Sequence, residues 1–121
     1  MKIVNREEFL KLPENTLYSK FKPCYFDGLS IKYDTTGNDF VCVSIIDSIE
    51  CDSSVEFSDK LFDAMENKKS ITMDFDNCGR DGMFDDDQLF AVWESDDIRK
   101  LIIELNNCLD ATARQEAEPK S

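Results

Sequence analysis

The chain has 121 residues, and its 26 Asp and Glu against 14 Lys and Arg give a formal net charge of -12 at pH 7. This length suits one domain with a single core, and the charge opposes direct binding to nucleic acid or to an anionic membrane surface. Histidine is absent, which removes the commonest acid–base catalyst and metal ligand of proteins. Because no apolar segment reaches the roughly 18 to 20 residues of a membrane span and no signal-peptide pattern is present, we expect a cytoplasmic protein.

The cysteines indicate a reducing compartment. Their number is odd and no two of them form a C-x-x-C pair, so neither a disulfide framework nor a zinc site is indicated. Cys42 lies in an apolar segment and Cys108 in a helical pattern, where cysteine commonly behaves as a small buried apolar group. We expect free thiols at all five positions, as in a cytosolic protein: Cys24, Cys42, Cys51, Cys78 and Cys108.

The first element is predicted to be a short helix. Asn5 followed three residues later by Glu8 matches a capping box, and Val4 and Phe9 are placed to form a hydrophobic staple around it. The helix is expected to stop at Pro13, because proline lacks the amide hydrogen that a helix interior needs.

Three strands are predicted to follow. Residues 17–22 and 29–33 alternate apolar and polar side chains, and Asp27-Gly28 between them is typical of a hairpin turn. Residues 35–38, with the sequence Thr-Thr-Gly-Asn, predict the next turn. Residues 40–46 are apolar on both alternating faces, as expected for a central strand that is covered on both sides.

A helix, two strands and a loop are predicted next. Ser58 is the expected N-cap of a helix that buries Leu61, Phe62 and Met65. Residues 71–75 alternate and predict a strand with one acidic face. A glycine-bearing loop over residues 77–86 then leads into an apolar strand over residues 88–93.

The last predicted element is an amphipathic helix. It begins at Ser95, and its apolar stripe has the spacing of one helical face: Ile98, Leu101, Ile102, Leu105 and Leu109. The pattern is lost from Ala111, so we expect residues 111–121 to form a disordered tail. The order α-β-β-β-α-β-β-α predicts a single α+β domain over residues 1–110, with about five strands in a largely antiparallel sheet and three helices packed on it.

The negative charge is concentrated in the middle of the chain. Residues 34–99 carry five basic and eighteen acidic side chains, a net charge of -13, whereas residues 1–33 have a net charge of +2. These acidic side chains alternate with aromatic ones, unlike those of an acidic disordered tail. Folded segments are therefore expected to carry the charge on their outer face.

The densest acidic segment, residues 74–88, could be a calcium loop. Asp74, Asp76 and Gly79 match positions 1, 3 and 6 of the EF-hand pattern. Arg80 at position 7 would place a positive charge beside the ion, and Asp85 replaces the bidentate Glu at position 12. A strand also precedes the segment where an EF-hand has a helix. We therefore expect no metal site.

A second interpretation makes these carboxylates catalytic, and a third makes them a recognition surface. Without His, a nucleophile motif or a phosphate-binding glycine loop, nothing completes a catalytic site, so we expect neither an enzyme nor a cofactor. A row of fixed carboxylates can instead occupy a cationic groove and steer association with a basic partner. An acidic face that only keeps the protein soluble is the simpler alternative. The predicted partner-binding residues are Asp74, Asp76, Arg80, Asp81, Asp85, Asp86 and Asp87.

Arg80 and Asp81, between two glycines, have two possible roles of their own. They could form an internal ion pair that fixes the loop. Alternatively, Arg80 could point outward and bind an anionic group such as a phosphate, which would suit a protein that binds and sequesters a small nucleotide signal.

The segment Gly79-Arg80-Asp81-Gly82-Met83-Phe84-Asp85-Asp86-Asp87-Gln88-Leu89-Phe90-Ala91-Val92-Trp93-Glu94 carries a family resemblance. Together with the segments over residues 6–13 and 16–18, it resembles small uncharacterised acidic proteins of bacteriophages and prophages, over most of residues 1–105. The resemblance implies an inhibitor of host defence, such as an anti-CRISPR or anti-restriction protein, some of which mimic nucleic acid. It implies no catalytic residue.

The favoured hypothesis combines these observations. We expect a non-enzymatic phage-type protein, acting in the cytoplasm of a host bacterium, that binds and inhibits a basic, nucleic-acid-binding surface of a bacterial defence protein. The alternative is a small-ligand binding protein that sequesters a nucleotide signal.

Overall fold

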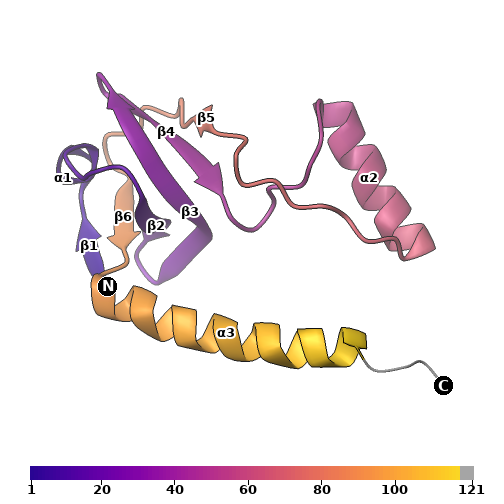
Figure 1. Cartoon of the computed structure of the whole chain (residues 1–121). Helices are drawn as coiled ribbons and strands as arrows, with labels where there is room; N and C mark the ends of the chain where they lie inside the picture. The colour runs from indigo at the N-terminus through magenta and orange to yellow at the C-terminus, as the bar shows by residue number, and fades with distance from the viewer. Residues whose placement is uncertain (118–121) are drawn as a thin grey trace.

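The computed structural model describes residues 1–117 and shows a single α+β domain (Figure 1). The predicted fold class is therefore confirmed. The elements in chain order are β1 (Lys2–Val4), α1 (Arg6–Leu10), β2 (Thr16–Lys22), β3 (Tyr25–Thr36), β4 (Asp39–Ser44), α2 (Ser54–Asn67), β5 (Gly79–Arg80), β6 (Leu89–Val92) and α3 (Ser95–Ala117).

All strands belong to one antiparallel sheet of six strands, with the order β1-β6-β2-β3-β4-β5. β6, the last strand in the chain, lies between β1 and β2 and pairs with both. β5, a strand of two residues, pairs with β4 at one edge, with Val41 opposite Arg80. The acidic segment after β5 therefore starts at this edge and ends at β6, between β1 and β2.

The core lies between α1 and the sheet and consists mainly of aromatic rings. Phe9 of α1 stacks on Phe90 of β6 with ring centroids 3.9 Å apart, and it meets Tyr18 and Phe40 edge to face. All four rings are buried. The predicted capping box at the start of α1 is confirmed, since the Asn5 side chain accepts a hydrogen bond from the Glu8 amide. The cap thus fixes α1 where Phe9 can enter the core.

Several predicted boundaries are wrong in the N-terminal half. Residues 2–4 form a strand that was not predicted. The first hairpin turns at Pro23-Cys24, as the pairing of Lys22 with Tyr25 shows, and Cys24 has a φ of 63°. Asp27-Gly28 therefore lies inside β3, where the pairing with β2 shifts register, instead of forming the turn. The turn after Thr36 is found as predicted, with Gly37 at a φ of 64°.

The second half differs more. The N-cap of α2 is Ser53, whose side chain accepts from the Glu56 amide, and not Ser58. Of the predicted strand over residues 71–75, only Met73 forms a bridge, to Ile49. α3 continues to Ala117, so the part of the predicted tail over residues 111–117 is helical; residues 118–121 lie outside the described part.

The two long helices leave most of their apolar side chains exposed. No residue of α2 or α3 is buried. Figure 1 shows α2 standing apart from the sheet and the C-terminal half of α3 extending beyond it. The apolar faces that were expected to be buried are therefore largely open to solvent. In residues 1–117, no helix combines the length and the apolar character that crossing a membrane requires.

Candidate functional site

The acidic segment after β5 is held by a buried ion-pair cluster around Asp81. The Asp81 side chain is only 5% exposed, and its Oδ1 lies 2.6 Å from Lys20 Nζ on β2. Its Oδ2 lies 3.7 Å from Nη1 of Arg6, the first residue of α1. The ion pair predicted between Arg80 and Asp81 is not found within residues 1–117, because Arg6 and Lys20 occupy the two oxygens of Asp81 instead. Asp81 is an anchor of the loop and not part of its outer surface.

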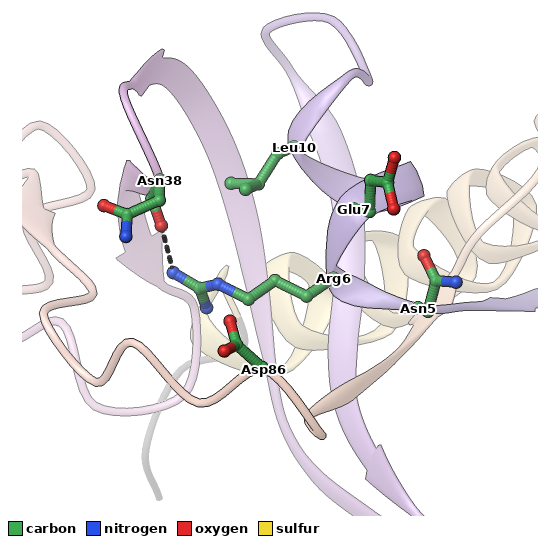
Figure 2. Close-up of a pocket in the computed structure, with 6 residues that line it drawn as sticks. All are labelled: Asn5, Arg6, Glu7, Leu10, Asn38 and Asp86. Carbon is green, nitrogen blue, oxygen red and sulfur yellow. Dashed lines mark hydrogen bonds between the residues drawn. The ribbon is translucent and has the colours of Figure 1, made fainter.

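Arg6 connects this anchor to the turn before β4. Its Nη2 donates to the carbonyl oxygen of Asn38, and its guanidinium lies 5.7 Å from the centroid of the Phe40 ring. Figure 2 shows the Arg6 side chain reaching from α1 to Asn38, with the Asp86 carboxylate turned toward it. A buried arginine needs such partners, because a guanidinium that loses water without replacement is strongly destabilising.

A second contact fixes the loop at Gly82. The Asp39 carboxylate accepts a hydrogen bond from the Gly82 amide at 3.0 Å, and the Asp81 amide donates to the Phe40 carbonyl at 3.0 Å. The bond from Gly82 is the main reason why the pKa of Asp39 lies below its ordinary value. Gly82 has a φ of +67°, a conformation that favours glycine.

The far end of the loop is fixed by Gln88. Its Nε2 donates to the carbonyl oxygens of Phe21 at 3.0 Å and of Leu89 at 2.8 Å. The residues between the two attachment points, 82–87, are exposed. We call this exposed segment, Gly82 to Asp87, the acidic loop.

Asp85, Asp86 and Asp87 are presented on the acidic loop. Asp85 Oδ1 accepts from the Asp87 amide at 3.0 Å, which is a local turn within the loop. None of the three forms an ion pair within the described residues 1–117. Three consecutive carboxylates are therefore available to a partner.

Asp74, Asp76 and Arg80 lie outside the acidic loop. Asp74 is half-buried and its Oδ1 accepts from the Asp76 amide at 3.0 Å, whereas Asp76 is exposed. They do not form the predicted row on a strand face, because residues 71–75 are not a continuous strand. Arg80 is exposed on β5 and lies beside the acidic loop in the chain. Arg80 pairs with Val41 at the edge of the sheet, and no hydrogen bond or ion pair within residues 1–117 links it to Asp85, Asp86 or Asp87.

Two cavities adjoin these segments. One, of about 350 Å³, is lined by Asn5, Arg6, Glu7, Leu10, Asn38 and Asp86 (Figure 2). The other, of about 330 Å³, is lined by Cys51, Asp52, Asp74, Asp76 and Asn77. Among residues 1–117, no group of three or more Cys, Asp or Glu side chains is arranged to hold a metal ion.

The anchor residues Arg6, Lys20 and Asp39 were not identified from the sequence. Each lies far along the chain from Asp81, and no local motif marks it. The only available signal was the concentration of basic residues in the N-terminal third, which supplies the cations that the acidic middle lacks. Comparisons with protein-family models, with curated proteins and with solved structures found no match.

Proposed function

We propose that the protein is a non-enzymatic inhibitor whose acidic loop binds a basic, nucleic-acid-binding surface of another protein. The observation that carries this proposal is the construction of the loop. Buried contacts of Asp81 and Gln88 fix its two ends, while Asp85, Asp86 and Asp87 stay exposed and form no ion pair within residues 1–117.

A loop that is fixed before binding loses less conformational entropy when a partner engages it. Its three acidic residues are consecutive, so their Cα atoms lie about 3.8 Å apart and three negative charges are concentrated in one short segment. A groove built for phosphates is lined by cations that such a concentration of charge attracts.

The overall charge supports the same proposal. A net charge of -12 attracts a basic protein over distances of about 10 Å at 0.1 M salt and speeds its association. The resemblance to small phage proteins makes a bacterial defence protein the partner to test first. Such an encounter would take place in the cytoplasm of the host.

The alternative, sequestration of a nucleotide signal, has less support. Arg80, the residue expected to bind a phosphate, does not line the cavity beside α1. The arginine that does line it, Arg6, already donates to Asn38 and lies near Asp81. Glu7 and Asp86 add negative charge to the same cavity, which opposes an anionic ligand.

The proposal is tested by affinity capture from a bacterial lysate with three forms of the protein. The loop variant is Asp85→Asn/Asp86→Asn/Asp87→Asn. The control variant, Asp59→Asn/Glu66→Gln/Asp110→Asn, changes the net charge equally at exposed positions on α2 and α3. We expect a protein that is captured by the natural chain and the control, is lost with the loop variant, and is released at about 1 M salt.

The captured protein is then tested for nucleic-acid binding. Addition of the natural chain is expected to displace labelled DNA or RNA from it, and the loop variant is expected to displace much less. Equal capture by all three forms would contradict the role of the acidic loop. Capture without displacement would contradict inhibition by mimicry.

A further inference from the structure

The C-terminal half of α3 is an amphipathic helix without a partner in its own chain. Ile102, Leu105 and Leu109 are 50%, 55% and 63% exposed, although their spacing places them on one face. Together with the half-buried Ile98 and Leu101 they form a continuous strip, which we call the α3 stripe. Burial of such a strip is what normally stabilises a helix in a protein.

The sequence of this half would not keep it helical alone. Residues 102–117 mix strong helix formers, such as Ala111 and Ala113, with weak ones, such as Asn106 and Asn107. An isolated helix of about 15 residues is marginal in water even when its sequence favours helix. The helix observed over these residues therefore needs an apolar surface that residues 1–117 of the same chain do not provide.

The total solvent-accessible surface of the chain can be compared with the surface expected for a compact monomer of the same mass. The chain exposes 8983 Å², whereas a compact monomer of 13.9 kDa is expected to expose about 6,700 Å². The excess of about 2,300 Å² belongs to the chain as a whole and is larger than the ~800 Å² that each partner contributes to a standard interface, so the chain has enough uncovered surface to form one. The apolar side chains of α2 account for part of this excess.

We propose that the α3 stripe is covered by the same stripe of a second copy, with the two helices antiparallel about Leu105. With Cys108 included, the face between residues 101 and 109 is symmetric around Leu105: Ile102 and Cys108 lie three positions away on either side, and Leu101 and Leu109 lie four positions away. An interface across a two-fold axis must be complementary to itself in this way. No charged side chain lies among these five positions.

The antiparallel arrangement follows from charge and shape. The sheet lies at the N-terminal end of α3, and the C-terminal half extends away from it (Figure 1). Antiparallel helices place the two acidic bodies at opposite ends of the pair, separated by most of the roughly 34 Å length of a 23-residue helix. A parallel pair would bring the two acidic sheet regions side by side, in chains that each have a net charge of -12.

Sedimentation equilibrium of the full chain tests this proposal. At about 0.15 M salt and micromolar concentrations we expect the mass of two chains. Leu105→Asp is expected to give the mass of one chain. The matched control is Ile103→Asp: Ile103 is 59% exposed on the same helix, but it lies about 160° around the axis from Leu105, so its dimer should persist.

Disulfide trapping tests the register and direction, and it does not depend on the aspartate variants. In Ile102→Cys, the new thiol of one copy lies opposite the native Cys108 of the other, so mild oxidation should give a covalent dimer. The variant Ile102→Cys/Cys108→Ser should lose this dimer. Both variants also carry Cys24→Ser, Cys51→Ser and Cys78→Ser, because these thiols are exposed or half-buried and could form other disulfides. If the variant without Cys108 still forms a covalent dimer, the proposed arrangement is wrong.

Three other results would overturn the proposal. A monomeric natural chain would leave the stripe to a different protein. A dimer that survives Leu105→Asp would lie elsewhere on the surface. If both Leu105→Asp and Ile103→Asp dissociate the dimer, then dimer formation depends on the stability of the whole helix and not specifically on the α3 stripe.

Discussion

Substitution of Asp81 by Asn gives the strongest test of the anchor that holds the acidic loop. The change keeps the shape of the side chain and removes its charge. Arg6, which is 5% exposed, then loses its only carboxylate within 4.0 Å among residues 1–117, and Lys20, which is 25% exposed, loses a contact of 2.6 Å. Two cations thus remain in place without the anion that balanced them.

The expected loss can be estimated from these contacts. Removing one partner of a fully buried ion pair destabilises a protein by about 3 to 5 kcal/mol. The loss is smaller here because Lys20 can turn toward solvent and Arg6 keeps its hydrogen bond to Asn38. The charge-assisted bond from Lys20 alone is worth about 1.5 to 3 kcal/mol. We therefore expect Asp81→Asn to lower the free energy of unfolding by about 3 kcal/mol.

Urea unfolding measures this loss, with the fluorescence of Trp93, the single tryptophan, and far-UV circular dichroism as two probes. Asp87→Asn is the control, because Asp87 is exposed, forms no ion pair within the described residues and does not line the cavity beside Arg6; it should change the free energy of unfolding by less than about 0.5 kcal/mol. A loss below about 1 kcal/mol in Asp81→Asn, or equal losses in both variants, would refute the reasoning.

Three further predictions concern smaller features. The pKa of Asp39 is lowered in the folded state, so its stabilisation is present above the unfolded value near 3.9 and is lost as the pH falls through the folded value. When urea unfolding is measured as the pH falls from about 5 to about 2, the free energy of unfolding should decrease less in Asp39→Asn than in the natural chain. An equal decrease in both proteins would contradict this. Asn5→Ala, which removes the hydrogen bond accepted from the Glu8 amide at 2.9 Å, should cost about 1 kcal/mol in the same assay, and no change would exclude a stabilising cap. Gly82→Ala should cost about 1 kcal/mol because of its φ of +67°, whereas Gly79→Ala, with open space and no positive φ, should be nearly neutral; equal effects would show that backbone strain is not the cause.

The sequence was sufficient for the parts of the fold that depend on local patterns. The capping box of α1, the turn at Gly37 and the alternating β2 each carry a signal within a few residues, and the structure confirms them. The fold class followed from the order of such elements. α2 was also recognised, although its first turn was missed because two serines, Ser53 and Ser58, could each serve as the cap.

Features that depend on distant segments could not be predicted in the same way. Asp27-Gly28 is typical of a turn, but the chain already reverses at Pro23-Cys24. Gly28 instead lies in β3, where the pairing between β2 and β3 shifts register. The alternation over residues 71–75 would suit a strand, yet β4 pairs with β5, and this segment meets its neighbour only at the single bridge from Met73 to Ile49. The alternation of apolar and polar residues describes which side of a strand each side chain faces. A strand also needs a neighbouring segment with which its backbone can pair over several residues.

The candidate site shows the same limit. The acidic loop was located from composition alone, but the sequence placed Asp81 on its surface with its neighbours. Its burial depends on Arg6 and Lys20, more than 60 residues earlier in the chain. Pairing between charges that far apart leaves no periodic or spaced pattern to detect.

The position of β6 determines the order in which the sheet can form. β1 pairs only with β6 among the described strands, so during synthesis β1 lacks this neighbour until residues 89–92 have been made. Until then β2 also exposes the edge that β6 will occupy. Contacts this distant in sequence slow folding, because a long loop must close before they stabilise anything. A nascent or truncated chain that ends before β6 therefore carries an open sheet edge and is prone to aggregate.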